Sequence, residues 1–187
     1  MIKNNDYQKS IEPGKTTKIR GRYLETEWME DNMGHLNIGD QAPEFALPDQ
    51  EGKTVKVSDF QGKKLLLYFY PKANTPGCTK QACQIRDART ELEELGVAAL
   101  GISPDKPDAQ KKFDGKFGLG FPLLSDPDHV AAQAYGTWGE KNMYGKKSFG
   151  IIRSSFLIDE NGKIMGVWYK VKPDDTVPLA RKVLGAE

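Results

Sequence analysis

The chain has 187 residues, of which 38% are hydrophobic and 28% are charged, a composition typical of a globular protein with one domain-sized core. Its 27 basic and 26 acidic residues nearly cancel, so no charge excess indicates binding to nucleic acid or to an anionic membrane surface. No apolar run approaches the roughly 18 residues of a membrane span.

Residues 1–32 differ in pattern from the rest of the chain. They are polar and show neither the alternation of a strand nor the period of a helix. They also lack the apolar core of a secretory signal. We expect a flexible extension, or one that is not native to the protein, with Met33 as a candidate start. The alternative is an ordered strand or helix that packs on residues 33–187, which we expect to form the domain.

Three strands are predicted early in this domain. Residues 45–47 and 54–57 flank the turn sequence of residues 49–52, which is typical of a β-hairpin. Residues 65–70 form a short, continuous apolar run. Such a run, bounded by turn signals, favours a strand that is covered on both faces.

A helix and another buried strand are expected next. Apolar residues recur at spacings of three and four from about Cys78 to Leu95, which predicts one helix with a buried face. Gly96 is placed to end this helix, and residues 97–102 form a second apolar run. A strand, a helix and a strand in this order predict a right-handed parallel crossover.

The second half of the domain contains further helices and a hairpin. We predict helices over residues 106–117, 128–135 and 174–184, and strands over residues 154–158 and 164–168 joined by a tight turn. The sum is a thioredoxin-like α/β fold with an added N-terminal β-hairpin.

Two groups of side chains are assigned structural roles by default. The charged stretch from Asp105 to Lys116 is interpreted as a solvated helix face. Five aromatic residues are interpreted as core: Phe69, Tyr70, Trp138, Tyr144 and Phe149.

The only two cysteines, Cys78 and Cys83, lie where the apolar strand gives way to the predicted helix. Backbone N–H groups and the helix dipole favour a thiolate at such a position, and a second cysteine five residues on can trap an oxidised form of the first. With only two distant histidines, His35 and His129, the pair makes a poor zinc site, and we predict neither a metal nor a cofactor. Two cysteines suit a reducing compartment, so we expect a cytoplasmic protein.

Three segments resemble the peroxiredoxins. The pattern Pro71-x-x-x-Thr75-x-x-Cys78 matches the active-site motif of that family. Thr79-Lys80-Gln81-Ala82-Cys83 and the Arg86-Asp87 pair after it are similar to the bacterioferritin-comigratory protein, or peroxiredoxin Q, group. Residues 151–159 resemble the family segment that supplies the active-site arginine. The resemblance extends from about residue 36 to residue 184.

The resemblance implies a thiol peroxidase that reduces hydrogen peroxide and organic hydroperoxides and takes electrons from thioredoxin or a similar dithiol. Carried over by position, it makes Cys78 the peroxidatic cysteine and Cys83 the resolving cysteine, and Thr75, Pro71 and Arg153 complete the site. It also implies a monomer or a weak dimer.

Each of these residues has a physical reason to be in such a site. The Thr75 hydroxyl both donates and accepts, so it can hold the thiolate and a peroxide oxygen together. Arg153, brought in from a distant strand, would stabilise charge that develops on the leaving oxygen. Pro71 offers no N–H group and can shield the sulfur from water.

Helix geometry adds a constraint on the two cysteines. Residues 78 and 83 of one continuous α-helix have Cα atoms about 8.7 Å apart. A disulfide needs less than about 7 Å, so the first turns of the helix must unwind for Cys78 to bond to Cys83. We expect Cys83 to lie opposite the buried stripe of Ala82, Ile85 and Leu92, where its release disturbs the core least.

Other functions are compatible with parts of the pattern. A thioredoxin-like disulfide reductase is disfavoured because the cysteines are spaced Cys-x-x-x-x-Cys rather than Cys-x-x-Cys. A redox sensor or holdase would use the same disulfide as a switch. A one-cysteine peroxidase would use Cys78 with an external thiol.

Overall fold

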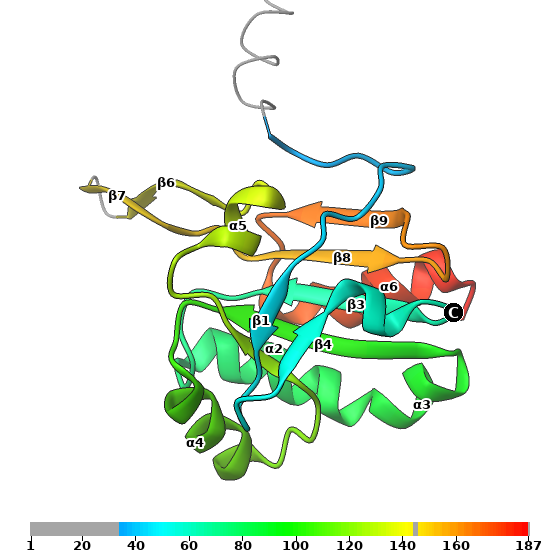
Figure 1. The fold of residues 1–187 in the computed structure, drawn as a ribbon, viewed down its shortest axis with the longest axis horizontal. Coiled ribbons are helices and arrows are strands. Elements are labelled where there is room, and N and C mark those ends of the chain that lie inside the picture. The colour runs from blue at the N-terminus through cyan, green and yellow to red at the C-terminus, as the bar shows by residue number, and fades with distance from the viewer. Residues whose placement is uncertain (1–33, 144–145, 187) are drawn as a thin grey trace, which may run out of the picture. The chain divides into compact units, whose positions relative to one another are not determined.

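A computed structural model describes residues 34–143 and 146–186 of the chain (Figure 1). The expectations for residues 1–32, for Met33 and for Tyr144 lie outside these ranges. None of the helices within them is long and apolar enough to cross a membrane.

A five-stranded sheet in the order β5-β4-β3-β8-β9 organises the described residues. Its strands are β3 (Lys64–Phe69), β4 (Val97–Ser103), β5 (Leu123–Ser125), β8 (Ser154–Ile158) and β9 (Ile164–Tyr169). β3, β4 and β5 run parallel to one another, whereas β8 is antiparallel to both β3 and β9. The predicted crossover from β3 to β4 and the predicted β8–β9 hairpin are therefore confirmed.

The sheet is covered on both faces, as the apolar run of β3 predicts. Leu65, Leu67 and Phe69 pack in one buried cluster, and Leu66 and Tyr68 pack in another. This division follows from the alternation of side chains along a strand.

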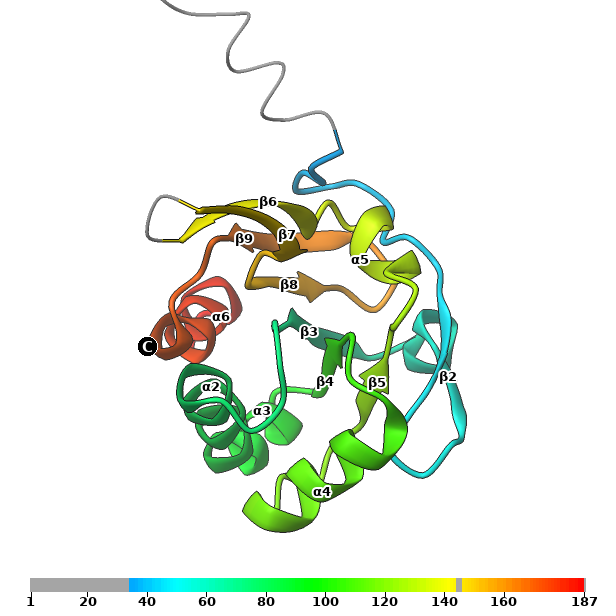
Figure 2. The ribbon, with the colours of Figure 1, turned by 90° about the vertical axis from the view of Figure 1, so that its left-hand side faces the viewer.

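Helices cover one of these faces. They are α2 (Pro76–Asp87), α3 (Arg89–Glu94), α4 (Pro107–Phe117) and α6 (Thr176–Leu184), and α6 follows the short 3-10 helix η2 (Pro173–Asp175). The opposite face is covered by α5 (Val130–Ala134) and by the antiparallel hairpin of β1 (Ala46–Pro48) and β2 (Thr54–Lys56), which the 3-10 helix η1 (Val57–Phe60) follows. Figure 2 shows the two layers edge-on. This is the predicted thioredoxin-like arrangement with an added N-terminal hairpin.

The continuous helix predicted from Cys78 to Leu95 is wrong in two respects. The helix begins earlier, at Pro76, and it ends at Asp87, after which α3 begins at Arg89. Ala88 between them has a ψ angle of 0°, whereas an α-helix has about −42°. The buried stripe continues through the break, so the apolar period could not reveal it.

Three strands were not predicted from the sequence: β5, β6 (Trp138–Met143) and β7 (Lys146–Ile151). β5 is only three residues long. β6 and β7 form a separate antiparallel ribbon. Phe149 on β7 is 69% exposed, so its assignment to the core is wrong. It alternates with Ser148 and Gly150 on a two-stranded ribbon, which offers it no covering layer.

Candidate active site

Cys78 lies at the start of α2, at the end of the sheet where β3 finishes. Thr75 is the N-cap residue, Pro76 is the first residue of the helix, and Cys78 is the third. The Cys78 side chain is only 1% exposed. The first N–H groups of a helix have no partners within it and form the positive end of its dipole, so this position favours negative charge on the sulfur.

Arg153 supplies a positive charge directly to this sulfur. Its Nη2 donates to Cys78 Sγ over 3.2 Å, although the two residues are 75 positions apart in the chain. Arg153 is placed by the junction between β7 and β8, and its carbonyl accepts from Val171 N at 3.0 Å. A Cβ on Gly77 would lie 3.4 Å from Arg153 Nη2, so the glycine leaves room for the guanidinium group.

Gln81 fixes the orientation of Arg153, and the sequence interpretation had missed it. Its Oε1 accepts from Arg153 Nη1, while its Nε2 donates to Thr176 Oγ1 at 2.8 Å. Gln81 is fully buried, and its bond to Thr176 is shielded from water. The signal in the sequence was its position three residues after Cys78, which places the two side chains on one face of the helix.

Thr75 and Pro71 lie in the loop that leads to the helix. The Thr75 hydroxyl donates to the Lys72 carbonyl at 3.0 Å, and the Thr75 carbonyl accepts from Thr79 N at 2.8 Å. The hydroxyl proton is thus held within the loop, and the described structure shows no hydrogen bond from it to Cys78. Pro71 comes directly after Tyr70, whose N–H group pairs with Ile102 of β4.

Cys83 lies on the same helix as Cys78, and both are free thiols. The helix is continuous from Pro76 to Asp87, so the separation of about 8.7 Å expected for ideal geometry excludes a disulfide in this conformation. The prediction that Cys83 lies away from the buried stripe is wrong in part. Its side chain is half-buried and packs against the cluster that contains Cys78 and Ala82. The buried surface of α2 is therefore wider than the predicted stripe.

A network of polar side chains holds the loop before α2. Asp105 Oδ2 accepts from Ala73 N at 2.7 Å and from Ser103 Oγ at 2.8 Å. Gln110 Nε2 donates to Ser103 Oγ at 2.8 Å, and its Oε1 accepts from the Tyr70 hydroxyl. Asp105 and Gln110 therefore do not belong to a solvated helix face, which corrects the interpretation of residues 105–116.

We expect Asp105→Ala to lower kcat/KM for hydroperoxide by roughly tenfold, because the Ala73 N–H group loses its acceptor and the loop carrying Pro71 and Thr75 loses its anchor. Stopped-flow measurement of the first peroxide reaction would show this. Asp108→Ala, on the exposed side of α4, is the matched control and should react at the wild-type rate. A wild-type rate in Asp105→Ala would show that the network does not position the loop.

Lys141 brings a second positive charge toward the site from β6. Its Cε and Nζ atoms lie 3.5 Å from where a Cβ on Gly150 would be. Burial, and then the positive charge of Arg153, lower the pKa of its amine, while Cys78 acts in the opposite direction. No feature of the sequence distinguished Lys141 from other lysines.

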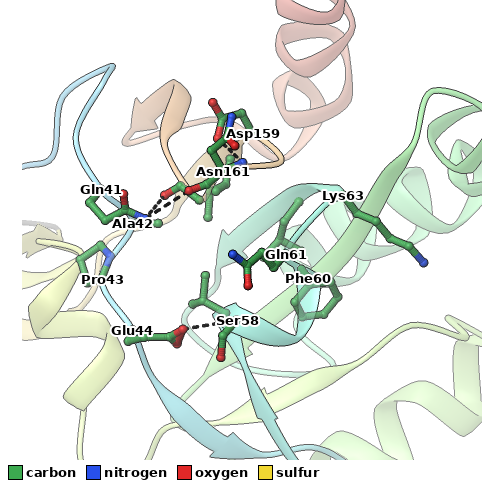
Figure 3. Close-up of a pocket in the computed structure, with 14 residues that line it drawn as sticks. Gln41, Ala42, Pro43, Glu44, Ser58, Phe60, Gln61, Lys63, Asp159 and Asn161 are labelled. Atoms are coloured by element: carbon green, nitrogen blue, oxygen red, sulfur yellow. Dashed lines mark hydrogen bonds between the residues drawn. The ribbon is translucent and has the colours of Figure 1, made fainter.

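Figure 3 shows a cavity whose lining includes neither Cys78 nor Arg153. It has a volume of about 500 Å³ and lies between residues 41–44, residues 57–61 and the turn at residues 159–162. Leu65, at the start of β3, lines it, whereas Cys78 follows the other end of that strand. We therefore assign it no part in the reaction of Cys78.

A buried cysteine at a helix N-terminus, with an arginine on its sulfur and a second cysteine five residues on, is arranged to react as a thiolate with an electrophilic oxygen. In a thioredoxin-like fold this arrangement defines a thiol-dependent peroxidase.

The comparisons with known proteins agree with this class. The AhpC/TSA family model matches residues 38–167, and the chain belongs to this family. Peroxiredoxin Bcp of Escherichia coli K12 is 54% identical over 136 residues, which cover 73% of this chain and 87% of that protein.

Two solved structures are similar to the chain. One is the bacterioferritin comigratory protein of Xanthomonas campestris, from a study of its alkyl peroxide reduction activity. It matches this chain with a TM-score of 0.71 and 34% sequence identity, and the match covers 76% of this chain and 90% of the Xanthomonas chain. Peroxidoxin BcpB of Mycobacterium tuberculosis has a TM-score of 0.73 and 34% identity over 81% of this chain and 98% of that one. The chain is thus a peroxiredoxin similar to the Bcp, or peroxiredoxin Q, proteins.

Proposed function

We propose that Cys78 attacks hydrogen peroxide and organic hydroperoxides, that Cys83 resolves the product as a disulfide, and that thioredoxin or a similar dithiol in the cytoplasm reduces this disulfide. The observation that carries the proposal is the 3.2 Å contact of Arg153 Nη2 with the buried Cys78 sulfur at the N-terminus of α2.

The first step transfers one oxygen to sulfur. The Cys78 thiolate attacks the terminal peroxide oxygen, the O–O bond breaks, and the sulfur becomes a sulfenic acid. The electron pair of the broken bond leaves with the second oxygen, which takes up a proton to become water or an alcohol. Arg153 and the free N–H groups at the start of α2 are placed to stabilise the charge on this oxygen.

Thr75 and Pro71 act on this step from the loop. Because the Thr75 proton is directed at the Lys72 carbonyl, the hydroxyl oxygen presents only its lone pairs. It is therefore suited to accept a hydrogen bond from the incoming hydroperoxide. Pro71, without an N–H group, limits the access of water to the sulfur.

The second step joins the two cysteines. The Cys83 thiolate displaces hydroxide from the sulfenic sulfur, and the hydroxide leaves as water after taking up a proton. The first turns of α2 must open for this step, because the intact helix keeps the two residues too far apart. A dithiol reductant then restores both thiols by exchange.

The test is peroxide consumption coupled to thioredoxin, thioredoxin reductase and NADPH, with intact-mass analysis of the oxidised protein. We expect turnover, and a loss of two hydrogens that maps to a Cys78–Cys83 link. With one equivalent of peroxide, Cys83→Ser should gain one oxygen on Cys78 and form no internal disulfide, because its sulfenic acid has no internal partner.

Other results would separate the remaining functions. Steady turnover of Cys83→Ser with an external thiol would indicate a one-cysteine enzyme. A Cys78–Cys83 disulfide that forms without catalytic turnover when the reductant is present would indicate a redox sensor or holdase. No reaction of Cys78 with peroxide would contradict the proposed first step.

A further inference from the structure

Tyr68, in the middle of β3, carries a buried hydroxyl without a hydrogen-bond partner. The side chain is 0% exposed, and no described residue donates to or accepts from its hydroxyl. Buried polar groups in proteins are almost always paired, because leaving one unpaired destabilises the state that buries it. The two other tyrosines that are fully buried in the described structure are both paired: Tyr70 with Gln110, and Tyr135 with the Pro43 carbonyl.

Close packing holds the Tyr68 ring in this position. The ring stacks on Tyr70 at 5.3 Å between centroids and meets the ring of Phe121 edge-on at 6.3 Å. Gly101, its partner on β4, has no side chain, and a Cβ there would lie 2.8 Å from Tyr68 Cζ and Oη. The glycine thus makes room for the phenol end of the ring, and the strands fix the hydroxyl where it finds no acceptor.

Tyr68 lies on the face of the sheet that α2 covers, and α2 is the helix that must open in the proposed cycle. Tyr68 belongs to the cluster in which α2 buries Cys78, Ala82 and Ile85. Burial, with smaller effects of neighbouring groups, raises the pKa of Tyr68 well above its ordinary value, so the group stays a neutral O–H donor.

Opening of α2 changes the surroundings of this hydroxyl. In the proposed opening, Cys78 and Ala82 would leave the cluster that contains Tyr68, and water would then reach the phenol end of Tyr68. The opened state then forms a hydrogen bond that the closed state lacks, while the apolar ring stays packed against Tyr70 and Phe121.

We propose that the unpartnered Tyr68 hydroxyl biases α2 toward opening. It thereby accelerates the conversion of the Cys78 sulfenic acid into the Cys78–Cys83 disulfide. This inference rests on the proposed function, since it concerns the resolving step. Two reactions compete for the Cys78 sulfenic acid: resolution by Cys83, and further oxidation to the sulfinic acid by a second peroxide. In this proposal Tyr68, a core residue of β3, favours resolution.

The test compares Tyr68→Phe with Tyr135→Phe. Both variants remove one hydroxyl from a fully buried tyrosine, but only Tyr135 loses a hydrogen bond, and it lies in the cluster on the other face of the sheet. After one equivalent of hydrogen peroxide, quenched samples analysed by mass give the rate of disulfide formation. In excess peroxide they give the fraction of sulfinic acid.

We expect Tyr68→Phe to form the disulfide about tenfold more slowly, which corresponds to about 1.4 kcal/mol, and to accumulate more sulfinic acid. The rate of the first peroxide reaction should stay within about twofold of wild type. Tyr135→Phe should form the disulfide at the wild-type rate. An unchanged or faster disulfide step in Tyr68→Phe, or an equal slowing in both variants, would overturn the proposal.

Hydrogen exchange on the reduced proteins tests the same inference without any disulfide. The amides of α2 should exchange about tenfold more slowly in Tyr68→Phe than in wild type, whereas the amides of α6 should not change. This readout remains decisive even if the wild-type protein forms no Cys78–Cys83 link, so the failure of the proposed function and the failure of this inference are distinguishable. Unchanged exchange of the α2 amides would overturn it.

Discussion

Replacing Cys78 by serine is expected to abolish hydroperoxide reduction, with a loss of at least about 10³-fold in kcat/KM. Serine has nearly the same size and keeps the start of α2 intact, but its hydroxyl does not react with a peroxide oxygen as a thiolate does. The coupled NADPH assay, together with a direct measurement of hydrogen peroxide consumed, would show the loss.

Cys83→Ser is the matched control for this variant. It makes the same chemical change on the same helix, five residues away, and it should retain the first reaction with peroxide at the wild-type rate. Thermal unfolding would establish that both variants are folded. If Cys78→Ser still consumed peroxide, the nucleophile would have to be another residue.

The second large effect is expected for Arg153→Met, which should lower the rate of the first peroxide reaction by about 10²-fold. The variant removes the donor to Cys78 Sγ and leaves Gln81 Oε1 without its partner, while it keeps much of the side-chain volume. Rapid mixing with hydrogen peroxide under single-turnover conditions measures this step apart from reduction by thioredoxin.

Arg153→Lys separates charge from geometry. Lysine keeps the positive charge but cannot donate to the sulfur and to Gln81 from one planar group. We expect it to recover only part of the loss, about tenfold below wild type. Lys56→Met, which removes an exposed charge on β2, should have no effect. A wild-type rate in Arg153→Met would show that the arginine only stabilises the fold.

The central sheet was predictable because each of its long strands has an apolar pattern that is visible in the sequence. β3 and the first part of β4 are continuous apolar runs, and a helical period lies between them, so the parallel crossover followed from the pattern alone. The β6–β7 ribbon gave no such signal. Its sequence is rich in glycine and charge, and its place is set by Ile151 in the core and by the pairing of the two strands.

The residues that carry out the proposed chemistry of the site could be predicted from the sequence. Cys78 was located by its position between strand and helix, and Arg153 by resemblance to the family segment around it. Gln81 and Asp105 were missed because each acts through a partner that is distant in the sequence, Thr176 in one case and the Ala73 backbone in the other. A glutamine in a helix and an aspartate beside a charged run are common on protein surfaces, so only the tertiary structure distinguishes these two.

The break at Ala88 divides the apolar stripe between two helices, each with its own polar contacts. α3 is tied to α6 by the ion pair of Glu91 with Arg181, and to the loop before β5 by a bond from Arg89 to the Gly120 carbonyl at 2.8 Å. In the proposed cycle, unwinding that starts at Pro76 therefore meets a boundary before it reaches α3. We therefore expect the first turns of α2 to open while α3 stays packed on the sheet. A catalytic cycle that repeatedly melts part of a helix can then proceed without exposing the rest of the core to aggregation.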